Sequence, residues 1–480
     1  MARVELIVFL SLVLDLFAFT IPLPLFPRLI EWYTLREISN PRGFLSRTLQ
    51  FVSLVRGFFY EPGAHSQRWD VVLLGGLMGS VFSTLQFLVS PKIGSLSDKY
   101  GRKRVLLITM IGNILSAVVW IQSTTFASYM LSRVIGGLSE GNVQLAIAIL
   151  SDVTTPANRS KALAYVGIAF AICFCIGPPI GAYFASQPLP RSMDSLGSEL
   201  NVYAVPAILT LVLLLAEILF LVVFLPETRG KGIPKDSGEL KTKSSKTQQN
   251  GNGSTGNGVS KPTHKYSVDR RIQTLKSLRR LHFWFLGIFS GMEFTLTFLT
   301  FDLLDWDNKQ NGMLIGSIGI ISALLQGGYV RRAMSKIGEG VMARRGVSSC
   351  AIGLLLLAAF PSFVSTRPTV AMNLLRAGAV CLAFTSATVV NALTAFASLQ
   401  CDEGGFDPDT GKAFEEHPQL TKGNALGRFR SSGQLGRAIG PLLACASYWT
   451  FGPTYTYGVS ALAMVALSMG MKSIAAKKSS

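Results

Sequence analysis

The sequence predicts an all-α membrane protein with twelve transmembrane helices in two pseudo-symmetric six-helix bundles. Hydrophobic residues make up 49% of the 480 residues and charged residues only 15%, whereas a soluble chain carries about 25% charge. The apolar residues form about a dozen long runs, and a helix needs roughly 20 mostly apolar residues to cross a bilayer. A polar gap separates six runs from six, which indicates a duplicated half.

Each predicted span is an apolar run bounded by charged or turn-forming residues. The spans lie at residues 4–26, 71–91, 104–124, 127–150, 161–184, 202–225, 281–303, 309–330, 346–364, 371–398, 424–448 and 454–471. The N-terminal bundle therefore covers residues 1–228 and the C-terminal bundle covers residues 276–480. The first run carries Asp15 and continues to Ile30, so it is predicted to be a span rather than a cleavable signal peptide.

Residues 229–275 separate the two bundles and are rich in Gly, Ser, Asn and Lys. Such a segment cannot bury enough apolar surface to fold, so a disordered linker is predicted. Its basic charge places it in the cytoplasm. With an even number of spans in each half, both termini should then be cytoplasmic. Residues 27–70 form a long loop on the opposite side, with an amphipathic interfacial helix expected around residues 44–60.

The net charge of +18 raises the question of nucleic-acid binding. The Lys and Arg residues lie mainly in the linker and in short loops between spans, which favours the positive-inside pattern of a membrane protein over a nucleic-acid partner. The six cysteines show neither a disulfide framework nor a metal site. Without a nucleotide-binding loop or a nucleophile–base spacing, no metal, no cofactor and no enzyme activity are expected.

The loop after the second span carries the strongest motif, with Gly94, Asp98, Gly101 and Arg102. Gly94 permits close approach of another helix, and Gly101 permits a tight turn. Asp98 can face a helix N-terminus, where a negative charge is favourable. Arg102 can pair with a carboxylate across the loop.

The stretch from Gly94 to Arg104 resembles the signature loop of the major facilitator superfamily, G-x-L-[SA]-D-[RK]-x-G-R-[RK], at every fixed position. The resemblance implies a gating loop that locks the two halves together on the cytoplasmic side. It also implies that Asp98 lies near the start of span 11, around residues 424–428.

Span 4 contains Arg133, Gly137 and Gly141 on one helical face. This spacing resembles the family motif R-x-x-x-G-x-x-x-G, whose arginine is associated with proton coupling. Glu140 should share this face about 10 Å further along the helix. The alternative is a glycine packing seam from which Arg133 extends outward to the interface.

Span 5 ends with Gly177, Pro178 and Gly181, and span 11 carries Gly440 and Pro441. The first group resembles the family's antiporter motif G-x-x-x-G-P-x-x-G, although Cys173 replaces its first glycine. The resemblance implies helices bent by glycine and proline at the interface between the halves.

An aspartate followed by prolines in span 1, Asp15 with Pro22 and Pro24, resembles the first helix of tetracycline-type and other drug–proton antiporters. The resemblance covers almost the whole chain. It is closest to the tetracycline-resistance-like, drug–proton antiporter branch, including its eukaryotic facilitator-domain members with a long first loop. It implies the major facilitator fold.

Charged side chains inside the spans cost about 2.5–3.5 kcal/mol each at the bilayer centre, so they mark function by default. The proton-coupling candidates are Asp15, Arg133, Glu140, Glu217 and Glu293. Because His282 falls at a predicted span end, a carboxylate is the expected proton carrier, with Asp15 first and Glu293 second. Each could instead belong to a structural ion pair.

The candidates for the substrate cavity are Arg437, Gln86 and Asn391. Arg437 could bind an anionic head group or form a packed interhelical pair. We expect a monomeric, proton-coupled secondary transporter that moves an organic solute across the lipid bilayer by alternating access. The alternatives are a uniporter or symporter of a small metabolite, and a non-transporting receptor or scaffold.

Overall fold

The computed structural model describes residues 2–22, 25–37, 40, 42–59, 66–185, 200–229, 268–306, 308–401 and 417–472. Residues 230–267, which are most of the predicted linker, lie outside this part of the chain. Disorder of the linker therefore stays a prediction.

The first half contains six spanning segments, and each coincides with a predicted span. They are α1 (Ala2–Thr20), α4 (Ser66–Tyr100), α5 (Arg102–Ile121), α6 (Phe126–Ser139) with α7 (Asn142–Val153), α8 (Pro156–Ala185) and α10 (Ala204–Phe224). α1 ends at Thr20, six residues before the predicted end of the first span.

The second half repeats this order of six segments. They are α11 (Val268–Leu304), α12 (Asn308–Leu325) with η2 (Gln326–Val330) and α13 (Arg331–Ile337), α14 (Glu339–Ala359), α16 (Pro368–Gln400), α17 (Lys422–Phe451) and α18 (Pro453–Gly470). A short helix, α15 (Pro361–Val364), follows α14. Within the described residues, eight of the twelve segments are long and apolar enough to cross a membrane on length and composition alone.

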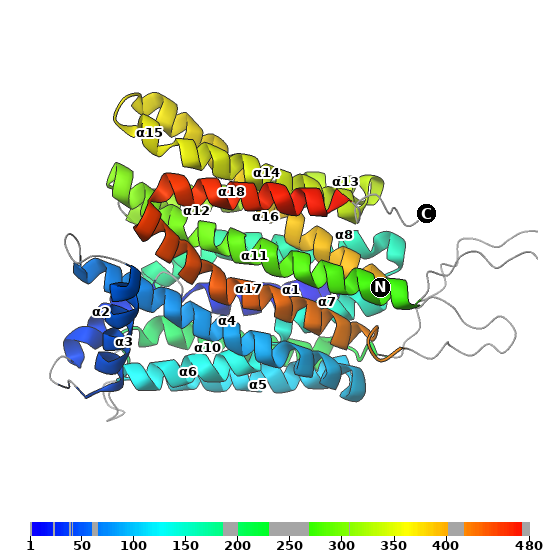
Figure 1. The fold of residues 1–480 in the computed structure, drawn as a ribbon. Helices are drawn as coiled ribbons and strands as arrows, with labels where there is room; N and C mark the ends of the chain where they lie inside the picture. The colour runs from blue at the N-terminus through cyan, green and yellow to red at the C-terminus, as the bar shows by residue number, and fades with distance from the viewer. Residues whose placement is uncertain are drawn as a thin grey trace, which may run out of the picture.

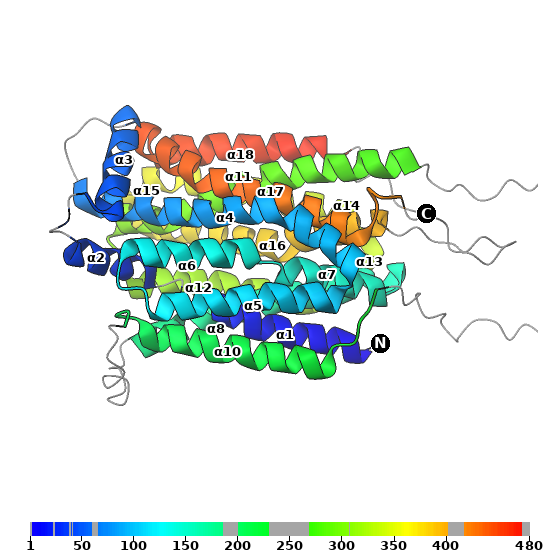
Figure 2. The same ribbon diagram turned by 90° about the horizontal axis from the view of Figure 1, so that it is seen from below.

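The segments run side by side, and the bundle has two distinct ends (Figures 1 and 2). At the linker end, α10 ends and α11 begins, and the first described residues of α1 and the last of α18 lie at the same end. The loop end carries α2 (Phe26–Arg36) and α3 (Phe44–Phe59). α3 coincides with the predicted amphipathic helix and lies across the direction of the bundle in both views.

A hydrophobic cluster at the loop end joins α2 and α3 to the first half. Tyr33 is at its centre, fully buried, and the Tyr33 hydroxyl donates to the carbonyl oxygen of Ser123 at 2.9 Å. Asn201 donates to the same hydroxyl at 2.7 Å. Burial raises the pKa of Tyr33, so the hydroxyl stays protonated and keeps both contacts at physiological pH.

Two positive-φ glycines show the duplication in the backbone. Gly101 has φ 100° and precedes α5, and Gly338 has φ 91° and precedes α14. Each occupies the turn between the second and third segments of its half. Only glycine adopts this conformation without strain.

The halves meet mainly through α4 against α17, and through α8 against α12 and α16. The contact between α4 and α17 is especially close, because a Cβ on Gly94 would overlap the carbonyl oxygen of Gly423. α17 therefore belongs to the interface between the halves, so its polar side chains can reach the first half.

Candidate functional site

Asp98 lies at the N-terminus of α17, as predicted. Its carboxylate accepts hydrogen bonds from the backbone N–H groups of Gly423 at 2.9 Å and Asn424 at 2.7 Å. These are two of the first N–H groups of α17, which have no partner within their own helix. A carboxylate from the first half thus caps a helix of the second.

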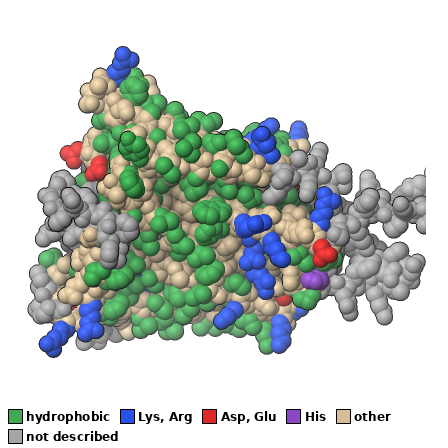
Figure 3. Space-filling model, in the orientation of Figure 1, with side chains coloured by type: hydrophobic (Ala, Val, Ile, Leu, Met, Phe, Trp, Pro, Cys, Tyr) green, Lys and Arg blue, Asp and Glu red, His purple; other side chains and the backbone are tan. Residues whose placement is uncertain are grey.

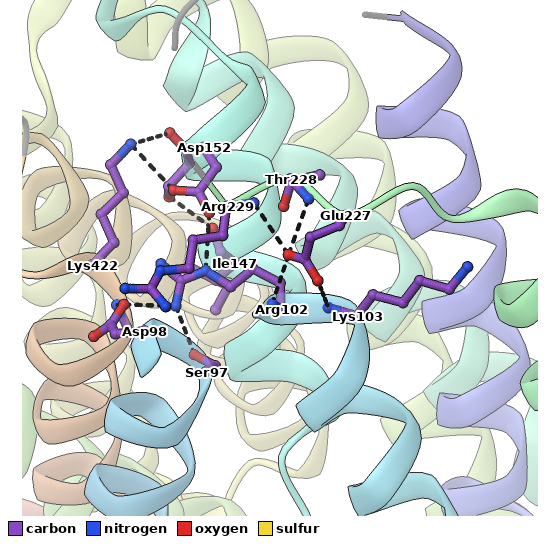
Figure 4. A network of polar contacts seen from close by, with 12 residues as sticks. Ser97, Asp98, Arg102, Lys103, Ile147, Asp152, Glu227, Thr228, Arg229 and Lys422 are labelled. Atoms are coloured by element: carbon purple, nitrogen blue, oxygen red, sulfur yellow. Dashed lines mark hydrogen bonds and ion pairs between the residues drawn. The ribbon is translucent and has the colours of Figure 1, made fainter. Parts of the chain in front are cut away.

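Arg102 extends this contact into a network of charges. Its guanidinium donates to Asp98 at 2.7 Å and to Asp152 at 2.9 Å, with only 4% of the side chain exposed. Lys422 of α17 forms an ion pair with the other oxygen of Asp152 at 3.4 Å. Charge-assisted hydrogen bonds with little solvent exposure are among the stronger polar contacts. We call Asp98, Arg102, Asp152 and Lys422 the linker-end lock (Figure 4).

Gly101 has a separate local role beside the lock. Its positive φ turns the chain into α5, and the Glu227 carboxylate accepts from the N–H groups of Arg102 at 2.8 Å and Lys103 at 3.1 Å. Glu227 thereby caps the N-terminus of α5 and joins the end of the last span of the first half to the loop.

Arg159 makes a second contact between the halves, which the sequence analysis missed. The side chain is fully buried and donates to the carbonyl oxygens of Ser151 and Thr154, both at 2.8 Å, at the end of α7. It also reaches the Ser398 hydroxyl near the end of α16 at 3.2 Å. Carbonyl groups at helix C-termini lack partners within the helix, so Arg159 satisfies two helix ends at once.

A cavity of about 60 Å³ lies inside the first half, with room for a few water molecules. Its polar lining includes Asp15, Asn113, Arg133 and Glu140. Three of the five proton-coupling candidates therefore line one cavity. This clustering is the most informative feature of the membrane interior.

Span 4 is broken beside this cavity, which corrects the prediction of one continuous helical face. α6 ends at Ser139, Glu140 has an extended backbone with ψ 94°, and α7 starts at Asn142. The estimate of about 10 Å along a single helix between Arg133 and Glu140 therefore does not apply.

The break creates a helix N-terminus next to Asp15. Asn142, the first residue of α7, donates from its side chain to Asp15 at 2.6 Å. Asp15 is only 4% exposed. A helix N-terminus favours a negative charge, so the broken helix gives this carboxylate a polar setting in an otherwise apolar segment.

Arg133 is held by aromatic rings rather than by a carboxylate. Its guanidinium carbon lies 5.6 Å from the ring centre of Trp120 and 5.4 Å from that of Tyr129. A guanidinium over an aromatic face is attracted by the ring quadrupole. Within the described residues no ion pair of Arg133 is within 4.0 Å, so its charge remains available to the cavity.

Glu217 lies apart from the cavity lining. It is fully buried, and one carboxylate oxygen accepts from Ser11 of α1 at 2.7 Å, while the other has no hydrogen-bond partner among the described residues. Glu217 is thus placed between α1 and α10. It is close enough for its charge and that of Asp15 to interact.

Two arginines of α17 lie near carboxylates: Arg430 near those of the first half, and the exposed Arg437 near one of the second half. The charges of Glu140 and Asp15 act on Arg430, and Arg437, seven residues further on, shares its face of the helix. The charge of Arg437 acts in turn on Glu293 of α11. In the described chain neither arginine has an ion-pair partner within 4.0 Å. Arg430 is a functional candidate that the sequence analysis missed.

The remaining predicted residues lie at helix contacts. Gln86 is buried in α4, and its backbone carbonyl accepts from Ser90 at 2.6 Å. Asn391 of α16 is 8% exposed and lies against Gly167 of α8, where a Cβ would overlap its side chain. Asn391 is therefore at the contact between the halves.

The predicted bend glycines are packing sites within each half. A Cβ on Gly177 would overlap the Thr20 side chain, and one on Gly181 would overlap the carbonyl oxygen of Ile21. Gly440 of α17 contacts Gly287 of α11 in the corresponding way. α8 and α17 continue as helices through Pro178 and Pro441. These glycines thus hold α1 against α8, and α11 against α17.

His282 is more deeply placed than the sequence suggested, because α11 begins at Val268. The residue is 4% exposed, and its ring stacks on Phe429 with 4.1 Å between ring centres. The ring nitrogen Nδ1 lies 3.1 Å from the Phe429 carbonyl oxygen, so a proton on Nδ1 would complete this hydrogen bond.

Comparison with known proteins gives consistent matches over most of the chain. A family model described as Major Facilitator Superfamily matches residues 8–406. Major facilitator superfamily domain-containing protein 10 of Bos taurus is 32% identical over 464 residues, which cover 96% of this chain and 90% of that protein. The class H tetracycline resistance protein of Pasteurella multocida is 33% identical over 106 residues, 22% of this chain and 26% of that protein.

Solved structures are similar over nearly the full length, and one of them also resembles the sequence. The crystal structure of the human organic anion transporter MFSD10 (TETRAN) has a TM-score of 0.75 and 28% sequence identity. The match covers 98% of this chain and 99% of that one.

Proposed function

Since this chain belongs to the major facilitator superfamily and is therefore a multi-pass membrane transporter, not an enzyme, we propose that it moves an organic anion across the membrane, coupled to protons. The family and the helical fold predicted from the motifs are confirmed. The substrate class is supported by the human relative, which is described as an organic anion transporter.

The observation that carries the proposal is the pair Arg430 and Arg437 on one face of α17. Arg430 interacts electrostatically with Asp15 and Glu140 but forms no ion pair with either. Arg437 interacts in the same way with Glu293. Arginine presents a planar set of donors that matches carboxylate, sulfonate or phosphate groups. An organic anion is the class of solute that these side chains fit.

Anion binding and proton binding would be coupled because both depend on the charge of Arg430. A substrate anion and the carboxylates of Asp15 and Glu140 compete for Arg430, because each can neutralise its charge. When the carboxylates are protonated, Arg430 is available to the anion. By reciprocity the bound anion favours proton binding. Anion and proton should then move together, so this arrangement favours symport over the antiport suggested by the motif resemblance.

Alternating access requires one end of the pathway to close while the other opens. The linker-end lock and Arg159 join α4, α7 and α8 of the first half to α16 and α17 of the second. We propose that the linker end is cytoplasmic, since basic residues favour that side, and that breaking these contacts opens a cytoplasmic exit. One copy of the chain contains the linker-end lock, Arg159 and the arginines of α17, so we propose that a monomer transports.

The test is uptake of a panel of organic anions and cations by phosphatidylcholine proteoliposomes with an imposed pH gradient. Wild type should accumulate an anion when the outside is acidic, and lowering the pH should tighten its binding about 5- to 150-fold, the usual range for coupled sites. Arg430→Gln should lose both effects.

Arg345→Gln is the matched control, because Arg345 is an exposed arginine of the second half, in α14. Equilibration without accumulation would indicate a uniporter. Accumulation driven by an alkaline outside would indicate antiport. Absence of any uptake by folded protein would favour a receptor or scaffold.

A further inference from the structure

Basic side chains from both halves meet on the outer surface of the bundle near the linker end. Lys and Arg gather there over α4, α11 and α17 (Figure 3). The residues are Lys92 of α4, Arg428 of α17, and Lys276, Arg279 and Arg280 of α11. We call this set the basic patch.

Packing of the three helices brings these residues together. α17 lies between α4 and α11. A Cβ on Gly427, next to Arg428, would contact Pro91, next to Lys92. On the other side the charge of Arg428 acts on Arg279. Arg428 faces away from the interior because Arg430 and Arg437 occupy the opposite face of α17.

The patch lacks counter-charges within the described chain. The carboxylates that form ion pairs there, Asp98 and Asp152, pair with Arg102 and Lys422 instead. The Arg279 Nε atom is buried and has no hydrogen-bond partner. Like charges held together repel, and a buried donor without an acceptor is costly. Both costs fall if an anion binds between the arginines.

The surface changes character directly beside the patch, toward the middle of the bundle. The next exposed residues on two of the three helices are apolar: Leu88 of α4 is 55% exposed and Trp284 of α11 is 58% exposed. Exposed apolar residues next to a row of cations, with Trp at the boundary, are typical of the level where lipid head groups meet acyl chains.

We propose that the basic patch is a binding site for the phosphate head group of an anionic membrane lipid. The arginines would donate to the phosphate oxygens, which suit planar guanidinium donors. The acyl chains would lie along Leu88 and Trp284. Basic pockets between spans at this level fit such head groups. The lipid would bridge the halves beside the linker-end lock.

The test is native mass spectrometry of purified protein with equal amounts of phosphatidylserine and phosphatidylcholine. Wild type should bind phosphatidylserine preferentially. Each basic side chain contributes about fivefold to such binding, so Arg279→Gln with Arg428→Gln should reduce the preference roughly 25-fold. Arg345→Gln, an exposed arginine at the start of α14, should leave the preference unchanged.

A second variant distinguishes loss of lipid binding from misfolding. Lys92→Gln with Arg280→Gln alters only exposed side chains and should also lower the preference about 25-fold at an unchanged melting temperature. Equal binding of the two lipids by wild type, or an undiminished preference in this folded variant, would overturn the proposal. So would displacement of phosphatidylserine by excess inorganic phosphate, which would indicate a site for free anions.

Discussion

Asp98→Asn is predicted to open the linker end while leaving the protein folded. The carboxylate makes two hydrogen bonds to the N-terminus of α17 and one to Arg102, and only 15% of its side chain is exposed. Each bond loses its charge assistance, and a negative charge is removed from a helix N-terminus. Together these changes should cost the closed state about 2 kcal/mol. Folding should persist because Arg102 keeps Asp152 as its partner.

A free-energy change of about 2 kcal/mol corresponds to roughly 30-fold in the ratio of closed to open protein. A single cysteine replacing Ser90, fully buried between α4 and α17, would report opening in a background without the native cysteines. Its labelling by an impermeant maleimide from the linker side should become roughly 30-fold faster, since rare openings limit access.

Asp305→Asn is the matched control, because Asp305 is exposed at the loop end. It should leave the labelling rate of the cysteine at position 90 unchanged. If Asp98→Asn also leaves this rate unchanged at the wild-type melting temperature, Asp98 does not hold the linker end closed.

Three further predictions concern packing and the linker. Gly94→Ala should prevent full closure of the linker end, because the added Cβ would overlap the backbone of Gly423. The cysteine at position 90 should then be labelled fast whether residue 98 is Asp or Asn. Tyr33→Phe removes the hydrogen bonds to Ser123 and Asn201, which still bond each other, and should lower the free energy of unfolding by about 0.5–1.5 kcal/mol, measured by thermal melting against exposed Tyr100→Phe. Deleting half of residues 235–265 should preserve uptake if the remaining chain spans the gap; a large loss in correctly inserted protein would show a specific role.

The fold was predictable from the sequence because its determinants are local. Apolar runs fix the twelve segments, and the contact of Asp98 with α17 follows from a motif whose glycines and charges each have a simple physical use. The amphipathic pattern of residues 44–60 likewise predicted α3.

The site was only partly predictable, because it depends on how helices are rotated and where they break. Asp15 and Glu140 stand out as charges in apolar runs. Of the arginines in α17, Arg430 faces the first half and Arg428 does not, and packing against α4 and α11 decides this. The break after Ser139 was hidden by glycine spacing that also suits a continuous helix; the adjacent Glu140 and Gly141 were its only local sign. Arg159 gave no signal, since its partners are carbonyl and hydroxyl groups at the ends of α7 and α16, which carry no charge pattern in the sequence.

Proton movement driven by substrate tests the central claim most directly. Organic anion is added to proteoliposomes that contain a pH-sensitive dye and no imposed gradient. We predict that wild type acidifies the lumen as the anion enters, and that Asp15→Asn with Glu140→Gln still binds the anion but moves no protons. Acidification by this double variant at the wild-type rate, or anion entry into wild-type vesicles without a change in lumenal pH, would contradict the account.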